Sequence, residues 1–300
     1  MCKWCGSGEF INYGYRLVRG QRLRRHRCKR CQRTFSGPSR GPHFSDRKPQ
    51  VNRQLFYLLC AGVSQRRCAL LLRINRETVA RKIRKYAPYF RSWHESWLKT
   101  QTFSKPLLFD EMETFEHTKC KPLSIPIAVE EKSRFILGLH VASIPAKGKL
   151  AKIARKRYGR RENKRHDALT LLMNDMKAAN ATTVKIKSDK APVYPKLVKT
   201  HFPKAMHLRY KGRRGCVVGQ GELKAGGHDP LFYLNHNCAM IRDNLKRLSR
   251  RTWCTSKKPE QLQNLLNIYM VFHNRWLGAE SAVALPGEVA TLLPTAMGAS

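Results

Sequence analysis

The stretch PLLFDEMETFEHTKCKPLSIPIAVEEKSRFILGL, residues 106–139, contains three apolar runs separated by short polar segments. Each run is of strand length and rich in branched or aromatic residues, which favours β-structure. Residues 131–133 separate the second run from the third and have the length of a hairpin turn. We therefore expect three consecutive strands that form a meander over 106–115, 123–131 and 134–143.

Helices and strands alternate along the chain after this stretch. From their apolar spacing we expect, in order, a helix over 166–180, a strand over 184–189, a helix over 192–203, a strand over 206–210 and helices over 235–252 and 261–276. Three meandering strands followed by alternating helices and strands are the arrangement of an RNase H-like α/β domain, which we place at residues 105–276.

The first of these strands carries an unusual concentration of negative charge. Four of the 20 carboxylates of the chain lie within residues 110–116, although the chain has 59 Lys and Arg. Crowded like charges repel one another unless a cation lies among them. Glu111 and Glu113 point away from Asp110 on an extended strand, and Glu116 lies well along the chain. We expect these three glutamates to pair with surrounding Lys and Arg.

Asp110 ends the apolar run PLLF, and Asp189 ends the expected strand at 184–189. These strands are neighbours in the expected sheet, so two carboxylates 79 residues apart in sequence would meet at one place. Hard oxygen ligands bind Mg²⁺ or Mn²⁺, and two such ions a few ångströms apart can catalyse phosphoryl transfer. The alternative is that each Asp only caps the turn after its strand.

The overall charge indicates the kind of partner. The net charge is +39, and each phosphate neutralised by Lys or Arg releases a condensed counterion, which favours nucleic acid as the partner. Because 42% of the residues are hydrophobic, the chain can bury real cores and wholesale disorder is excluded. No stretch approaches the ~20 apolar residues of a membrane span, and we identify no signal peptide.

Two CxxC motifs, CKWC and CKRC, contain Cys2, Cys5, Cys28 and Cys31, with 22 residues between the pairs. In a reducing cytosol paired cysteines bind metal more often than they form disulfides, and two such pairs bring four thiolates to one tetrahedral zinc ion. The residues between them alternate enough for a short β-hairpin. We therefore expect residues 1–36 to form a zinc ribbon, whose Zn²⁺ is structural because four sulfur ligands leave no open position.

A linker rich in Gly, Pro and Ser, residues 36–49, precedes a helical segment at 50–90. Ser64 and Asn75 are typical N-caps of its second and third helices, and we expect the third helix to stop before Pro88. Two short helices with a tight turn, the second of them basic, form a helix-turn-helix; the alternative is a plain helical connector. The residues expected to face DNA are Arg76, Thr78, Arg81, Lys82 and Arg84.

Three further segments have a distinct composition. The very basic stretch 147–165 is either a mobile DNA-contacting loop or a charged helix. In KGRRGC, residues 211–216, we expect a phosphate-contacting loop that uses Lys211, Arg213 and Arg214, with a solvated turn as the alternative. The tail at 277–300 has no Lys or Arg, and its Ala, Pro and Gly content favours a loosely ordered appendage.

Taken in order, these modules resemble the bacterial insertion-sequence transposases of the zinc-ribbon DDE group. Residues 109–138 resemble the first catalytic strand and hairpin of that group, and KIKSDKAPVYPKLV, residues 185–198, resembles the segment with its second catalytic aspartate. Residues 235–257 resemble its closing helix, with the basic pattern KRL-x-R-x-T. The resemblance covers about residues 1–276.

The resemblance implies a third catalytic residue near the start of the closing helix, ten or eleven residues before Lys246. The family usually has Glu there, whereas this chain has Asn235 and His236. Both can ligate or position a metal through a neutral atom, but they lower the affinity of the site for hard Mg²⁺. Glu222, in GQGELKAGG, is the alternative third carboxylate, and a decayed, inactive copy is the remaining alternative.

The implied activity is that of a metal-dependent DNA transposase, cytoplasmic and associated with the bacterial nucleoid. Asp110 and Asp189 would hold two Mg²⁺ or Mn²⁺ ions, and Lys246 would contact phosphate near the scissile bond. The implied partners are double-stranded DNA, as terminal inverted repeats and as target, and a second subunit or more, because two element ends must be brought together. The rivals are a non-catalytic DNA-binding regulator and an RNase H-type nuclease without strand transfer.

Overall fold

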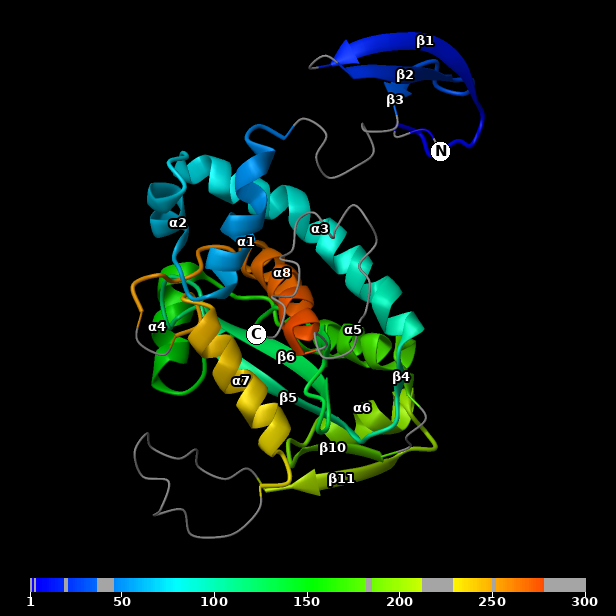
Figure 1. Cartoon of the computed structure of the whole chain (residues 1–300). Coiled ribbons are helices and arrows are strands. Elements are labelled where there is room, and N and C mark those ends of the chain that lie inside the picture. The colour runs from blue at the N-terminus through cyan, green and yellow to red at the C-terminus, as the bar shows by residue number, and fades with distance from the viewer. Residues whose placement is uncertain are drawn as a thin grey trace, which may run out of the picture. The chain divides into compact units, whose positions relative to one another are not determined.

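The computed structural model describes residues 2, 4–18, 21–36, 46–181, 185–211, 229–249 and 252–277 (Figure 1). The chain divides into two compact units, one with the described residues up to Gln54 and the other with those from Leu55 onward. Most of the expected linker and the expected tail lie outside the described residues. No helix in the described part of the chain combines the length and the apolar character needed to cross a membrane.

The first unit contains a small antiparallel sheet. Its strands are β1 (Phe10–Val18), β2 (Gln21–Cys28) and β3 (Thr34–Ser36), in the order β1-β2-β3. Val18 pairs with Gln21, so β1 and β2 form the hairpin that the sequence predicts between the two CxxC motifs. Its buried cluster consists of Cys2, Cys28 and Phe35, with Cys5 and Cys31 packed against them.

Three helices follow, α1 (Asn52–Cys60), α2 (Gln65–Leu71) and α3 (Arg76–Thr100). Both predicted caps are confirmed, because the Ser64 side chain accepts a hydrogen bond from the backbone N–H of Arg67, and Asn75 accepts one from that of Glu77. The predicted end of the third helix before Pro88 is wrong, since α3 continues through Pro88 for another three turns.

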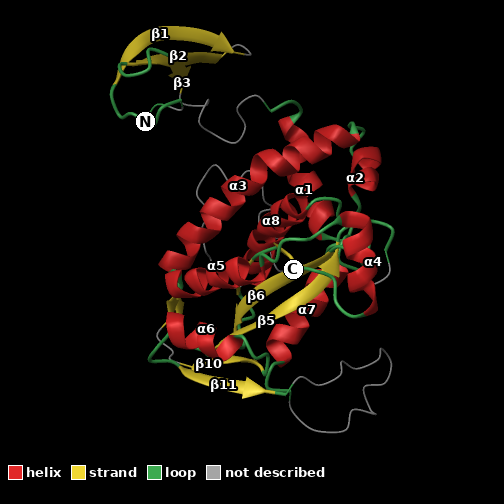
Figure 2. Cartoon of the chain, turned by 180° about the vertical axis from the view of Figure 1, so that it is seen from behind, coloured by secondary structure: helices red, strands yellow, loops and turns green. Residues whose placement is uncertain are grey.

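The buried face of α3 explains why the helix continues. Beyond Pro88 it carries Phe90, Trp93 and Trp97, and the helix packs along α8 (Pro259–Leu277), beside which it lies in both views (Figures 1 and 2). A proline inside a helix costs roughly 3 kcal/mol, and burying even two large aromatic side chains stabilises the fold by at least as much. Tertiary packing therefore overrides the local signal.

The second unit is built on a mixed sheet of β5 (Leu107–Phe115), β6 (Pro122–Glu130), β7 (Ile136–Leu139), β10 (Lys185–Asp189) and β11 (Met206–Tyr210). The order is β11-β10-β5-β6-β7, and β8 (Ala142–Ser143) also pairs with β6. The strands β5, β6 and β7 form the predicted antiparallel meander, while β10 runs parallel to both β5 and β11. A two-stranded sheet of β4 (Thr102–Phe103) and β9 (Asn180–Ala181) lies apart from it.

The expected third strand over 134–143 is in fact two strands. The chain breaks between β7 and β8 at His140, whose side chain bonds to Asp175 while its backbone N–H donates to the carbonyl of Pro126. The register with β6 also shifts between Ala128 and Val129. His140 lies opposite Pro126 in the same register as the pairs on either side, and Pro126 has no N–H to complete the ladder, which explains the break.

Helices α4 (Lys149–Tyr158), α5 (Arg165–Ala178), α6 (Tyr194–His201) and α7 (Phe232–Asn244) surround the sheet (Figure 2). The predicted helix over 235–252 is wrong at both ends, because α7 begins three residues earlier and stops at Asn244. After it the chain turns so that Leu245 and Leu248 are both buried. Residues three apart would share one face of a continued helix as well, so the burial of these two leucines does not explain why α7 ends at Asn244.

The two faces of the sheet meet different helices. Gly138, Ala128 and Phe109 are paired across β7, β6 and β5, so they share one face. A Cβ on Gly138 would meet Asp175 and Leu172, which places α5 over this face, and Phe109 also packs against Tyr194 of α6. Asp110 follows Phe109 and therefore lies on the opposite face, while α7 packs against β5 and β6.

Candidate functional site

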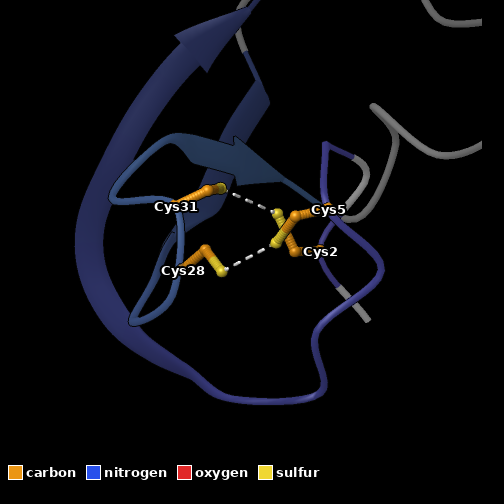
Figure 3. Close-up of side chains that lie close together, drawn as sticks. All are labelled: Cys2, Cys5, Cys28 and Cys31. Atoms are coloured by element: carbon orange, nitrogen blue, oxygen red, sulfur yellow. Dashed lines mark hydrogen bonds between the residues drawn. The ribbon is translucent and has the colours of Figure 1, made fainter.

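The four predicted zinc ligands come together in the first unit (Figure 3). The ligand atoms of Cys2, Cys5, Cys28 and Cys31 all lie within 4.8 Å of one another. The sulfur of Cys2 is 3.6 Å from that of Cys31, and the sulfur of Cys5 is 3.6 Å from that of Cys28. Within the described residues, this is the only such group of three or more His, Cys, Asp or Glu side chains.

The geometry of this cluster fits zinc. Zn–S bonds of about 2.3 Å in a regular tetrahedron place the sulfur atoms about 3.8 Å apart, close to the two measured separations. Burial raises the pKa of the Cys2 thiol, but hydrogen bonds from the backbone N–H groups of Trp4 and Cys5 outweigh it and lower that pKa to about 6. The thiolate form, which binds metal, is thus favoured. The four cysteines suggest a structural Zn²⁺ site, consistent with a zinc ribbon.

The two predicted catalytic aspartates lie at matching positions on adjacent strands. In the parallel pairing of β5 with β10, Ile186 is level with Leu107 and Lys187 with Leu108. Continuing this register places Asp189 level with Asp110. Asp110 is not at the end of its strand as expected, because β5 continues to Phe115, but it lies where the shorter strand β10 ends.

Each aspartate uses one carboxylate oxygen locally. Asp189 Oδ1 accepts a hydrogen bond of 2.8 Å from the backbone N–H of Ala191, so it does cap the following turn, as in the alternative interpretation. Asp110 Oδ1 accepts bonds from the backbone N–H of Glu111 and, at 3.2 Å, from the Tyr194 hydroxyl. Within the described part of the chain, Oδ2 of both residues has no hydrogen-bond partner. Capping and metal binding are therefore compatible.

Asp110 is largely buried and has two other carboxylates, those of Asp189 and Glu111, close to it. Burial raises its pKa to about 6, and the negative charges of Asp189 and Glu111 act in the same direction, against the hydrogen bonds from the Glu111 backbone and Tyr194. A carboxylate whose charge is unfavourable without a cation is typical of a metal or catalytic site. Neither Asp110 nor Asp189 forms an ion pair with a described Lys or Arg.

The three neighbouring glutamates do pair with cations, as predicted. Glu111 binds the Arg165 guanidinium through both carboxylate oxygens and also accepts a 2.6 Å bond from Ser124. Lys147 is 2.6 Å from Glu113, and Arg161 is 2.5 Å from Glu116. All three cationic partners belong to the basic stretch 147–165. Residues Lys149–Tyr158 of this stretch form α4, which confirms the charged-helix alternative there. Asp110 thus differs from the three glutamates, because it has no Lys or Arg partner among the described residues.

The structure distinguishes the candidates for the third position. Burial and the positive charge of Arg134 lower the pKa of His236, whose ring nitrogens are 3.3 and 3.5 Å from the Arg134 guanidinium. Asn235 is exposed and donates a 2.8 Å bond to Asp229. Cys238 lies one turn further along α7, and the charge of Asp110 adds to the burial that raises the pKa of its thiol to about 12. Asn235 and His236 both lie near the start of α7, the helix that packs against β5 and β6.

Two other expected site residues fall differently. Glu222, with Arg213 and Arg214, lies outside the described residues. Lys246 is exposed but lies in the turn after α7 and not on the helix, because α7 ends at Asn244. Lys246 is therefore not joined to Asn235 and His236 by three turns of one continuous helix.

The predicted DNA-facing residues of α3 divide into two groups. Arg76, Arg81 and Arg84 are exposed and Thr78 is partly exposed, as is consistent with a polar outer face, and Lys211 is exposed after β11. Lys82 is only 2% exposed, so it does not belong to that face. It lies beside Ile83 and Val79 on the buried side of the helix, where its aliphatic stem packs.

The sequence did not indicate two residues that support the acidic pair. The Tyr194 hydroxyl donates to both Asp110 and, at 3.1 Å, Glu111, and Arg165 holds Glu111 from the start of α5. Tyr194 lies five residues after Asp189, at the start of α6, and this short spacing after a strand-end aspartate is the one sequence signal that could have drawn attention to it.

No known protein-family model and no curated protein matches this chain. Its function is therefore inferred from the chemistry of the two candidate metal centres and from the charge around them.

Proposed function

We propose that the protein is a DDE-type DNA transposase that binds the ends of its element and catalyses metal-dependent cleavage and strand transfer. The observation that carries the proposal is the pair of Asp110 and Asp189, level with each other on neighbouring parallel strands and without a cationic partner among the described residues. A pair of carboxylates without a cationic partner is suited to binding divalent metal ions, and the net charge of +39 attracts DNA. Metal-dependent phosphoryl transfer on DNA explains both features together.

Asp110 and Asp189 are the proposed ligands of Mg²⁺ or Mn²⁺, through the oxygens that their local hydrogen bonds leave open. Bound ions would supply activation of the attacking oxygen and stabilisation of the leaving oxygen. Asn235 or His236 is the proposed third residue, because both lie near the start of α7, which packs against β5, and Glu222 is the alternative. Tyr194 and Arg165 fix the orientation of the acidic strand. Lys246, exposed after α7, is proposed to contact a DNA phosphate.

The arrangement of strands supports an RNase H-like fold for this domain. A meander of β5, β6 and β7 is followed by β10 and β11, which extend the sheet in parallel on the far side of β5. This is the order that the resemblance to the zinc-ribbon DDE group implies, and it places the first and fourth strands side by side, which the proposed site requires.

DNA binding is proposed to involve the first unit and the helices after it. The sheet of the first unit exposes Tyr13 and Tyr15. Arg22 lies 4.4 Å from the centroid of the Tyr15 ring, and Arg25 lies 5.4 Å from that of Tyr13. Arginine and exposed aromatic side chains together bind phosphates and pack against nucleotides. We further propose that α2 and the start of α3 form a helix-turn-helix, and that two subunits act together on the two element ends.

The experiment is a cleavage and joining assay with labelled terminal-repeat DNA in Mg²⁺ or Mn²⁺. The Asp110→Asn and Asp189→Asn variants keep the size of each side chain and remove its charge, so both should lose cleavage by at least about a hundredfold. The matched control is Glu113→Gln, which removes a charge from the same strand at an exposed residue paired with Lys147. It should retain cleavage.

Each rival function predicts a different result. Sequence-specific binding without nicking by the wild-type protein would support a regulator or an inactivated copy. The neutral Asn235 and His236, at the position where the family usually has Glu, are consistent with an inactivated copy. Nicking without joining would support a nuclease. Full joining activity in the Asp110→Asn variant would show that the proposed site is wrong.

A further inference from the structure

A large basic cavity lies beside α4. Its volume is about 1110 Å³. It is formed by α4, by the loop that follows it and by the ends of β6 and β8. The side chains that decide its chemistry are Lys121, Arg155, Tyr158, Arg160, Arg161 and Lys164.

The charge of this cavity is strongly positive. Five Lys or Arg side chains line it and Glu162 is the one carboxylate among its lining residues. Glu162 pairs with Lys164 at 3.2 Å, and Arg161 is engaged by Glu116. Arg155 and Arg160 are both exposed and form no ion pair with a described carboxylate. They therefore remain able to bind an anion.

Two details indicate an anion with an organic part. Arg161 lines the cavity together with the exposed Arg155 and Arg160, which brings three guanidinium groups to one wall. The Tyr158 ring lies at the wall, with Lys121 Nζ 4.6 Å from its centroid. The volume exceeds what one phosphate fills and is of the size that holds a small organic ligand.

We propose that this cavity binds a nucleotide unit through its phosphate, with Arg155, Arg160 and Arg161 as the donors and Tyr158 packing against the sugar or base. The inference goes beyond the proposed function, because it requires neither Asp110 nor Asp189. A nucleotide within a DNA strand and a free nucleotide share this chemistry, and the test separates them.

The test compares two double variants of the full-length, zinc-loaded protein. Arg155→Gln/Arg160→Gln removes two cavity cations. Lys156→Gln/Arg157→Gln removes two exposed cations of the last turn of α4 that do not line the cavity. Both double variants lower the net charge by two, so a difference between them reports the cavity. Circular dichroism and thermal melting check that both pairs fold like the wild type.

The first probe is a short fluorescein-labelled duplex of arbitrary sequence, followed by anisotropy over a range of salt concentrations. The cavity pair should weaken binding roughly tenfold and reduce the salt slope by about 0.9, because the cavity contacts one phosphate and each lost phosphate contact contributes about 0.9. Arg155→Lys/Arg160→Lys, which keeps both charges, should keep the slope. Equal weakening of duplex binding by the cavity pair and the control pair would exclude a nucleotide within a DNA strand as the ligand.

The second probe is thymidine monophosphate, followed by broadening of its phosphorus resonance. If the cavity pair abolishes this broadening and leaves duplex affinity equal to that of the control pair, the ligand is a free nucleotide. If the cavity pair selectively weakens duplex binding, the ligand is a nucleotide in a strand. If it changes neither probe more than the control pair does, the cavity is not a phosphate site.

Discussion

The two candidate metal centres differ in how the chain builds them. The four cysteines come from two CxxC motifs within residues 2–31 and lie on one small sheet, where they form most of the buried cluster. Asp110 and Asp189 are 79 residues apart and meet only because β10 pairs with β5 inside a larger sheet. The cysteine site is formed by residues close together in sequence and is part of the core of its own unit. The aspartate site exists only once the larger sheet has folded.

This difference implies different roles for metal in the two units. The small sheet exposes Ile11, Tyr13 and Leu17, so its described residues bury little apart from the cysteines and Phe35. A structural metal then supplies much of the folding free energy. The α/β unit instead buries large side chains such as Phe90 and Phe109 and has a core of its own. Metal at Asp110 and Asp189 would serve chemistry and not folding.

The largest expected effect is therefore loss of zinc from the first unit. Cys28→Ser replaces a fully buried ligand and should release the zinc and unfold the three-stranded sheet, because structural zinc contributes about 10 kcal/mol or more to folding. Zinc content by a colorimetric chelator and protease sensitivity of residues 1–36 measure this. The α/β unit should keep its melting transition.

The matched control is Cys254→Ser, because this cysteine is also free but lies outside the cluster. It should keep one zinc per chain. If Cys28→Ser also kept a full equivalent of zinc, the four-cysteine assignment would be wrong.

The second prediction concerns the loss of stability of the α/β unit in acid. His94 is fully buried, and its Nε2–H donates to the carbonyl of Ile136 at 2.9 Å. Burial lowers its pKa to about 4, and the nearby charge of Arg91 adds to this effect, while Asp175 and Glu95 oppose it. The unfolded chain takes up this proton below about pH 6.5, whereas the folded protein does so only near pH 4.

Protonation of His94 thus favours the unfolded state, and the α/β unit should lose roughly 3 kcal/mol of stability as the pH falls from about 6.5 to about 4. Urea unfolding at several pH values, followed by tryptophan fluorescence, measures the loss. His94→Gln should flatten this dependence. His273, whose pKa burial also lowers to about 4, remains in both proteins and gives a common background. An unchanged pH slope in His94→Gln would contradict the assignment.

The same contrast explains what the sequence could predict. The zinc ligands, the caps at Ser64 and Asn75, and the limits of β11 all depend on residues close together in the chain, and local patterns are sufficient for them. The neighbouring positions of Asp110 and Asp189 were also predictable, because the order of strands and helices determines which strands pair.

The errors arose where distant packing decides the outcome. Pro88 normally ends a helix, but α8 buries the far half of α3 and keeps it helical. Lys82 has the spacing of the basic residues around it, yet it faces the protein interior. The contact of Tyr194 with Asp110 requires α6 to pack over β5, and no local pattern specifies it.

The third prediction tests the close packing of α5 on the sheet. A Cβ at Gly138 would lie 2.5 Å from Asp175 Oδ2, and that oxygen is held by His140 at 2.7 Å. Asp175 also pairs with Arg91, so it cannot move without breaking two interactions. Gly138→Ala should destabilise the α/β unit by about 2 kcal/mol, seen as a lower urea midpoint. Gly8→Ala, where nothing lies within 4 Å, should leave that midpoint unchanged.

The smallest expected effect concerns the Tyr194 hydroxyl, which joins Asp110 and Glu111 of β5 to α6. Tyr194 donates to Asp110 at 3.2 Å and to Glu111 at 3.1 Å, while its ring packs on Phe109 with centroids 4.7 Å apart. Tyr194→Phe keeps the ring and removes only the hydroxyl, so we expect a loss of stability of about 1 kcal/mol. Because Asp110 then loses one restraint, affinity for Mn²⁺ should fall a few-fold.

Calorimetric titration with Mn²⁺ and urea unfolding measure the two effects separately. Tyr57→Phe is the matched control, since the Tyr57 ring packs on Phe272 and it has no hydroxyl hydrogen bond within the described residues. If Tyr194→Phe lowered stability but left Mn²⁺ affinity equal to that of the control, Tyr194 would support the fold and not the site. A loss of Mn²⁺ affinity beyond that of Tyr57→Phe would instead show that the α/β unit orients its metal ligands through contacts made far along the chain, as the zinc unit does through neighbours in sequence.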